Sequence, residues 1–198
     1  ELRVGRIDGA TGRGRIVRLD EEALEMEISL EADPPPPLAL TLVLALPRPP
    51  VLRRTLISVT SMGVKRIVLL NARAVEKSFW QSRALDEDAI FEQCVLGLEQ
   101  ARDTRMPEVL LRNRFRPFVE DELPAMVAGA KAFVAEPSAK ADPAPGPGEA
   151  ALLAVGPESG WSDHELLGLE NAGLDRISLG ARPLRVETAL PALLARFL

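Results

Sequence analysis

Two glycine-bearing segments in the C-terminal part of the chain have the residue types and spacing of ligand-binding turns. The first reads AVGPESGWSDHE and spans residues 154–165. Gly156 and Gly160 predict a tight turn directly after an apolar strand, and glycines let a ligand approach the backbone closely. Ser162 and Glu165 have the spacing of a capping box, which predicts that a helix starts there. We therefore expect exposed backbone amides at this turn that can bind polar groups.

The second segment reads LGARPLRVETA and spans residues 179–189. It also follows a predicted strand, contains Gly180, precedes a helix, and carries Arg182 and Arg185 three positions apart. Ligands of open α/β sheets bind beyond the carboxyl ends of the strands, so the two segments are placed to wall one small-molecule pocket. Neither segment is a G-x-G-x-x-G or P-loop sequence, so the sequence does not support binding of a dinucleotide or a nucleoside triphosphate. Each segment also fits a purely structural turn.

The composition of the 198-residue chain excludes several other kinds of chemistry. Cys94 is the only cysteine and His164 the only histidine. An intramolecular disulfide and a cysteine-cluster metal site are thereby excluded, and a histidine zinc site or a Ser–His–Asp triad is disfavoured. We expect no metal, a core position for Cys94 on an apolar helix face, and no catalytic role for His164 in the first turn of a helix. Chemistry must come from Arg, Asp, Glu, Ser, Thr, backbone groups or a bound cofactor.

Basic residues are concentrated in two parts of a chain whose formal net charge is −5. Residues 48–83 contain eight basic residues against one acid, a net charge of +7, and residues 1–18 have a net charge of +3. Arginines outnumber lysines by 20 to 4, and the guanidinium fork suits phosphate oxygens and base edges better than a point charge does. A segregated arginine-rich surface is what binding to a nucleic-acid backbone requires, although the charge alone fits an inert surface equally well.

The hydrophobic pattern predicts a small β module at residues 1–33, a stiff proline linker at 34–37, and an α/β domain at 38–198. In the module, residues 24–30 alternate between apolar and polar, which indicates an antiparallel sheet or small barrel with one buried face. Beyond the linker, alternating strand-like and helix-like segments indicate a mostly parallel, covered sheet. We expect strands at 38–46, 66–70, 109–111, 131–135, 151–155 and 174–179, helices at 51–62, 84–101, 162–172 and 187–198, and a Pro/Gly-rich loop at 137–148.

These pieces, in this order, resemble the RsmE-type 16S rRNA uridine-N3 methyltransferases of the SPOUT class. The matching segments are GPESG followed by WSDHE, LGARPLRVETA, SMGVKRIVLL and LEQARDTRMPEV, preceded by a β-rich module similar to a PUA-like RNA-binding barrel. The resemblance covers about residues 3–198. Ser159, Pro183 and Met62 depart from the usual Gly, Ile and Leu, and the barrel lacks counterparts of the family's first strands, so we expect an incomplete barrel.

The resemblance implies a fold and a cofactor. The fold would be a SPOUT α/β domain with a parallel sheet and a deep trefoil knot, in which the C-terminal segment threads a loop. The cofactor would be S-adenosyl-L-methionine, held by the two glycine-bearing segments. The cofactor-binding residues carried over are Val155, Gly156, Gly160, Leu179, Gly180, Leu184 and Arg185.

The resemblance also suggests candidate catalytic residues. N3 of uridine carries a proton and is a poor nucleophile until that proton is lost, so a base or a positive group that stabilises the uridine anion is required. Arg102 lies in the family-like Q-x-R segment and Arg185 in the second glycine-bearing segment. We expect one of them to stabilise the negative charge. Glu158 and Glu187 are candidates for accepting the proton or for orienting these arginines, and a structural carboxylate is an equal alternative.

The expected partner is 16S rRNA of the small ribosomal subunit. We expect Arg53 and Arg54 on an exposed helix face, and next Arg13 and Arg15 of the β module, to contact its phosphates. The resemblance implies a homodimer through the last helix and its neighbours. No DNA or membrane partner is expected, and the lack of a signal pattern at Glu1 leads us to expect a cytoplasmic protein.

Two alternatives remain open at this point. One is a SPOUT methyltransferase that acts on another RNA, such as a tRNA, because the G-P-E-x-G signature does not by itself fix the base. The other is a non-catalytic RNA-binding or ribosome-assembly protein. This alternative is compatible with Ser159 and Pro183, which differ from the residues usual in the family.

Overall fold

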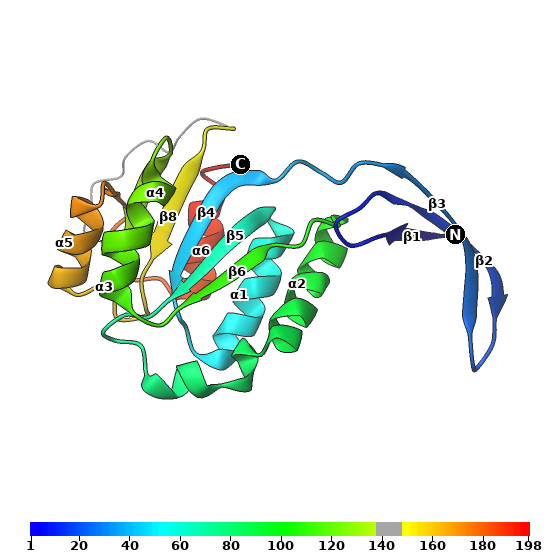
Figure 1. Ribbon diagram of the computed structural model, residues 1–198, viewed down its shortest axis with the longest axis horizontal. Coiled ribbons are helices and arrows are strands. Elements are labelled where there is room, and N and C mark those ends of the chain that lie inside the picture. Colours follow the sequence, from blue (N-terminus) through cyan, green and yellow to red (C-terminus); the bar gives the residue numbers. More distant parts are fainter. Residues whose placement is uncertain (138–147) are drawn as a thin grey trace.

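The computed structural model describes residues 1–137 and 148–198, which contain two separate β-sheets (Figure 1). The first is a three-stranded antiparallel sheet of order β1-β2-β3. The second is a six-stranded parallel sheet of order β6-β5-β4-β8-β7-β9. Figure 1 shows the small sheet extending away from the larger one, with α3, α4 and α5 at one end of the large sheet and α1 and α2 at the other.

The elements follow one another along the chain in a largely alternating order. The strands are β1 (Leu2–Gly5), β2 (Thr11–Leu19), β3 (Leu24–Ala32), β4 (Leu38–Ala45), β5 (Val64–Leu70), β6 (Glu108–Arg112), β7 (Lys131–Ala135), β8 (Ala151–Val155) and β9 (Asp175–Ile177). The helices are α1 (Pro49–Ser61), α2 (Glu87–Ala101), α3 (Phe115–Pro117), α4 (Leu123–Val127), α5 (Asp163–Asn171) and α6 (Val186–Leu194). Short 3₁₀ turns η1 (Lys77–Gln81) and η2 (Arg83–Leu85) precede α2, and a π-helical turn η3 (Phe118–Glu122) lies between α3 and α4.

The long apolar run at residues 38–46 becomes β4, a central strand of the parallel sheet. Its neighbours are β5 on one side and β8 on the other, and Leu42, Val43, Leu44 and Ala45 are completely buried. A strand covered on both faces needs apolar residues at successive positions, which explains why this segment does not alternate. The predicted parallel sheet is therefore confirmed, and β4 lies in the middle of its core.

Helices α1 and α2 pack closely because Gly97 has no side chain. A Cβ atom at Gly97 would lie 2.7 Å from the carbonyl oxygen of Ile57 and 2.7 Å from Cβ of Thr60. Cys94, one turn earlier on the same face, is fully buried, and burial raises the pKa of its thiol. The predicted core position of Cys94 is confirmed, and its neutral, inaccessible thiol is a poor nucleophile.

Every strand and helix predicted between residues 38 and 198 is present, with ends that shift by a few residues. The Ser162 capping box at the start of α5 is formed, and Gly63 has the positive φ of 87° that ends α1. Two regions were missed: the 3₁₀ turns at η1 and η2, and the short helical turns between residues 115 and 127. The predicted Pro/Gly-rich loop at 137–148 lies mostly outside the described residues.

The small sheet corrects one prediction. Its antiparallel strands are where the alternation placed them, but the apolar side is not buried: Leu24 and Ile28 are 48% and 56% exposed. The physical reason is that β1–β3 form a single open layer in the described chain, with no second layer over them. The sheet is anchored at one end, where the Asp8 amide donates to the Thr104 carbonyl at 2.7 Å and the Met106 amide donates to the Asp8 carboxylate at 2.8 Å.

None of the helices in residues 1–137 and 148–198 is both long and apolar enough to cross a membrane.

Candidate active site

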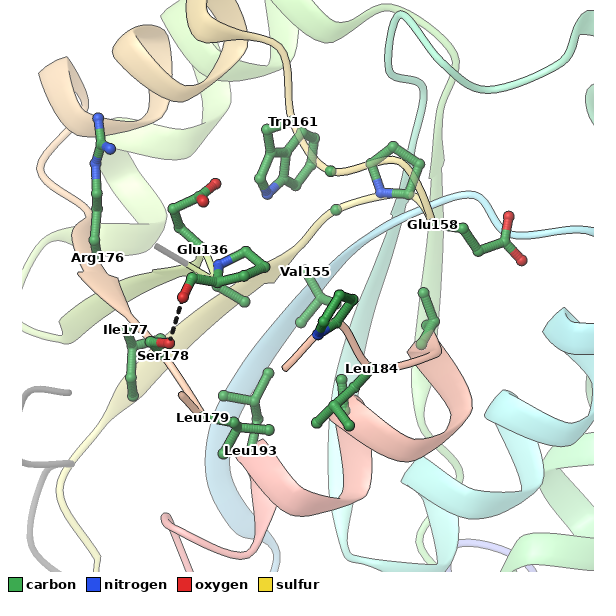
Figure 2. Close-up of a pocket in the computed structure, with 18 of the residues that line it drawn as sticks. Glu136, Val155, Glu158, Trp161, Arg176, Ile177, Ser178, Leu179, Leu184 and Leu193 are labelled. Atoms are coloured by element: carbon green, nitrogen blue, oxygen red, sulfur yellow. Dashed lines mark hydrogen bonds between the residues drawn. The ribbon is translucent and has the colours of Figure 1, made fainter. Parts of the chain in front are cut away.

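The two glycine-bearing segments meet at one cavity of about 480 Å³ beyond the carboxyl ends of β7, β8 and β9 (Figure 2). This volume lies within the range of small-molecule sites. The walls are mostly apolar, and Leu179 and Leu184 are 39% and 42% exposed there. From the predicted cofactor-binding set, the cavity is lined by Val155, Gly156, Gly160, Leu179, Gly180 and Leu184. Arg185 is the predicted member that does not line it.

The first turn is fixed by a hydrogen bond and by a tryptophan. The Gly160 amide donates to the Pro157 carbonyl at 2.8 Å, and Gly160 has a φ of 80° that favours glycine. Trp161 packs directly on Gly156, where a Cβ atom would lie 3.1 Å from the indole atoms Cδ1 and Nε1. The absence of a side chain at Gly156 therefore lets the indole form one wall of the cavity.

The indole nitrogen of Trp161 is a buried donor without an acceptor in the described structure. The side chain is buried, and its Nε1 has no hydrogen-bond partner. Figure 2 shows this nitrogen facing into the cavity. A buried donor left unpaired costs free energy, so an acceptor on a bound ligand would remove that cost.

The second turn follows β9 and is held by Ser178. The Ser178 hydroxyl donates to the Pro137 carbonyl at 3.1 Å, drawn as a dashed line in Figure 2, and the Gly180 amide donates to the same hydroxyl oxygen at 3.0 Å. Gly180 has a φ of 105°, again a conformation that favours glycine. The floor of the cavity is thus tied both to the end of β7 and to the turn that leads into α6.

The two candidate glutamates form ion pairs with arginines near α1. Glu158 accepts from Nε of Arg48 at 3.3 Å, and Glu187 accepts from Nε of Arg54 at 2.5 Å. In Figure 2 the Glu158 carboxylate points away from the centre of the cavity. The carboxylates therefore orient Arg48 and Arg54, whereas the sequence suggested Arg102 and Arg185 as the arginines they would orient.

The two candidate arginines are separated. Arg185 is the exposed N-cap residue of α6, directly after the cavity residue Leu184. Arg102 caps the C-terminus of α2 with a φ of 56° and lines a different cleft, between α2 and the small sheet, together with Arg3 and Arg13. The structure brings Arg185 to the edge of the cavity between the two glycine-bearing turns and places Arg102 outside it.

The predicted RNA-contacting arginines are all exposed, but three of the four are paired. Arg13 lies 3.5 Å from Glu1, Arg15 lies 2.5 Å from Glu27, and Arg54 pairs with Glu187. Arg53 has no ion pair within the described part of the chain. The net charge counted over residues 48–83 is partly neutralised in the same way by acids from distant segments.

Sequence reasoning missed several residues of the cavity. The sequence showed that Trp161 follows the glycines but not that it lines the cavity, because its packing on Gly156 depends on the geometry of the turn. Glu136 directly follows β7 and Arg176 lies within β9, and no motif marks either position. Arg176 pairs with Glu170 at 2.5 Å, and this hydrogen bond lowers the pKa of Glu170. The only sequence signal for these residues is their position at or near the carboxyl ends of adjacent parallel strands.

Comparison with known proteins agrees with this geometry. One curated relative is the ribosomal RNA small subunit methyltransferase E of Treponema pallidum, which is 29% identical over 197 residues, or 95% of this chain and 73% of that protein. Several solved structures share the fold, and two of them contain bound S-adenosylmethionine. One is a ribosomal RNA small subunit methyltransferase E from Neisseria gonorrhoeae bound to S-adenosyl methionine, with a TM-score of 0.76, 24% identity, and coverage of 98% of this chain and 81% of that one.

The other is a Legionella pneumophila structure described as a methyltransferase in complex with bound S-adenosylmethionine, with a TM-score of 0.71, 20% identity, and coverage of 94% of this chain and 77% of that one. The family described as "RNA methyltransferase domain" matches residues 34–198, which contain the whole parallel sheet and both glycine-bearing turns. The chain therefore belongs to the RNA methyltransferase domain family.

Proposed function

We propose that the chain is an S-adenosylmethionine-dependent methyltransferase that methylates N3 of a uridine in 16S rRNA. The observation that carries this proposal is the convergence of both glycine-bearing turns on one apolar cavity at the carboxyl edge of the sheet. The family assignment supplies the reaction class, and the names of the relatives from Treponema pallidum and Neisseria gonorrhoeae supply the RNA and the cofactor.

The residues of the cavity fit an adenosyl group. Val155, Leu179 and Leu184 offer apolar walls for a flat base, and the unpaired indole N–H of Trp161 offers a donor to a polar edge. The amides of Gly160 and Gly180 are used within their own turns, but the space beside both glycines is open, because no atom lies within 4 Å of where a Cβ atom would stand. We therefore assign Val155, Gly156, Gly160, Leu179, Gly180 and Leu184 to cofactor binding, with Trp161 as an addition to the sequence-derived set.

The bound cofactor supplies an activated methyl group on a sulfonium, and the chain supplies position and electrostatics. The uridine N3 proton must leave before the nitrogen attacks, and a cation near the base oxygens favours the anion that results. Arg185 is exposed at the edge of the cavity, so we assign this electrostatic role to Arg185. Arg102 lines another cleft of the same chain and does not share this site. Glu158 and Glu187 hold Arg48 and Arg54 beside the two turns.

We also infer the finer features of the fold that the resemblance implies. The C-terminal segment would thread a loop, forming a trefoil knot. The hydrogen bonds between Glu136 and Ile177 at 3.0 Å and between Ser178 and Pro137 at 3.1 Å support close passage of these two segments. Residues 1–33 would form a partial PUA-like RNA-binding module, 34–37 its linker and 38–198 the methyltransferase domain, which would dimerise through α6 and its neighbours.

The experiment that tests the function has two measurements. Titration calorimetry of the purified chain with S-adenosylmethionine should give saturable binding. Incubation with the cofactor and 16S rRNA transcribed in vitro, followed by mass mapping of the RNA, should reveal one added N3-methyluridine. Methylation of tRNA in place of 16S rRNA would show that the chain is a methyltransferase with a different RNA substrate. Binding of RNA without binding of S-adenosylmethionine would show that the chain is a non-catalytic RNA-binding protein.

Arg185→Ala should lower the rate of methyl transfer by about 100-fold, because removing one preorganised charge-stabilising group typically has an effect of this size. Arg185 does not line the cavity, so the dissociation constant for S-adenosylmethionine should stay within about twofold of the wild-type value by calorimetry. Arg83→Ala is the matched control, since Arg83 is also an exposed arginine and does not line the cavity. Full methyl-transfer activity in Arg185→Ala would remove Arg185 from the reaction.

A further inference from the structure

A second open groove adjoins the cofactor cavity at the carboxyl ends of β5 and β6. It has a volume of about 860 Å³. Its lining includes Asn71, Arg73, Lys77, Trp80, Arg116 and His164. Trp161 lines the cofactor cavity and the next residue, Ser162, lines the groove, so one turn separates the two spaces. Ligands of parallel sheets bind at this edge, and nothing assigned above occupies the groove.

The groove carries positive charge that is not neutralised within the described chain. Arg48, Arg54, Lys65 and Arg66 of the basic segment 48–83 each pair with an acid. Arg73 and Lys77 are exposed and make no ion pair among the described residues.

The acidic side chain in the groove wall does not cancel these charges. Glu165 is 5% exposed, and its two oxygens accept from the amide of Arg73 at 2.6 Å, the amide of Ser162 at 2.9 Å and the hydroxyl of Ser162 at 2.7 Å. Its lone pairs are directed at these donors and away from the open space. An anion in the groove therefore meets two cations that are unpaired among the described residues, Arg73 and Lys77, and a carboxylate whose oxygens are already hydrogen-bonded.

One wall of the groove is a fixed aromatic plane. The indole of Trp80 donates from Nε1 to Oδ1 of Asn71 at 2.9 Å, which ties it to the end of β5, and the side chain is half-buried. An immobilised indole beside unpaired cations matches the requirements of a nucleotide, because bases stack on aromatic rings and phosphates bind Arg and Lys.

We propose that this groove binds a nucleotide of the RNA substrate adjacent to the target base, with Arg73 and Lys77 on its phosphates and Trp80 against its base. The inference rests on the proposed RNA methyltransferase function and names where a neighbouring part of the strand is held. The target base enters the cofactor cavity while its neighbour is fixed across the Trp161–Ser162 turn.

The first test measures the salt dependence of RNA binding. The probe is 16S rRNA transcribed in vitro, titrated at several salt concentrations against wild type and Arg73→Ala/Lys77→Ala. Loss of two phosphate contacts should weaken binding at least tenfold at low salt and make the slope of log K against log salt shallower by roughly 1.4. Alanine keeps the amide of residue 73 that donates to Glu165, so the loop stays in place. Arg83→Ala is the matched control, an exposed arginine nearby that does not line the groove.

The second test uses the fact that the chain has two tryptophans, one for each space. In Trp161→Phe only Trp80 remains, and 16S rRNA should quench its fluorescence. In Trp80→Phe only Trp161 remains, and S-adenosylmethionine should change its fluorescence. If the double alanine variant keeps wild-type affinity and slope, or RNA binds without any change at Trp80, the groove proposal is overturned. If S-adenosylmethionine leaves Trp161 unchanged and does not bind by calorimetry, the proposed function fails instead.

Discussion

Gly97→Ala is expected to lower the free energy of unfolding by about 1–3 kcal/mol, the range typical of overpacking in a close contact. The added Cβ would lie 2.7 Å from the Ile57 carbonyl oxygen and from Cβ of Thr60, and both belong to the rigid body of α1. Helices α1 and α2 must therefore move apart. The expected sign is unusual, since Gly→Ala inside a helix normally gains up to about 1 kcal/mol from intrinsic propensity. Urea denaturation followed by circular dichroism measures the change.

Gly168→Ala is the matched control, because Gly168 is also an interior residue of a helix. A Cβ there would meet Phe115 at 3.7 Å and Val119 at 3.8 Å, which are ordinary contacts. This variant should be as stable as wild type or more stable. Equal stabilisation of both variants would show that α1 and α2 are not in the close contact described here.

Gly156→Ala is expected to weaken S-adenosylmethionine binding by about 10- to 100-fold, which corresponds to the cost of a small overpacked contact. The new Cβ would lie 3.1 Å from the Trp161 indole, so the indole must shift, and it is a wall of the cavity. Gly156 has no positive φ, so the effect comes from the contact and not from backbone strain. Titration calorimetry at constant temperature measures the affinity.

A double-mutant cycle isolates this contact. Trp161→Ala alone should also weaken cofactor binding, because the wall and its unpaired donor are lost. In the Trp161→Ala background, however, Gly156→Ala should have no further effect, since the atoms it would contact are gone. Additive losses in the double variant would mean that Gly156 acts on the cofactor by some route other than the indole.

Much of the large sheet was predictable because its signals are local. The continuous apolar run at residues 38–46 marks a strand covered on both faces, and Gly63 and the Ser162–Glu165 pair mark helix ends by backbone chemistry. The turns between residues 115 and 127 had no such signal, because short α and π turns have no sustained period. The alternation in β3 predicted strand geometry correctly and burial wrongly, because burial depends on a second layer that period two does not specify.

In the candidate site, too, the features encoded by neighbouring residues were predictable, and those that depend on distant contacts were not. The two glycine-bearing turns carry their geometry in their own residues, and the parallel sheet brings their ends together, so the cavity followed from order and spacing. The charge of the basic segment did not, because Arg48 pairs with Glu158 and Arg54 with Glu187, each more than 100 positions away. The net charge counted over a short stretch of sequence cannot detect ion pairs with acids from distant segments. Motifs alone made Arg102 and Arg185 alternative candidates for one role, and they could not show that the end of α2, with Arg102, lies at another cleft.

Glu165 connects two segments that are far apart in the sequence, the loop after β5 and the turn before α5. One of its oxygens holds the loop after β5 and the other holds the turn that precedes α5. A substitution at position 165 removes the hydrogen bonds to both segments at once, so the loop after β5 and the turn before α5 both depend on this one carboxylate.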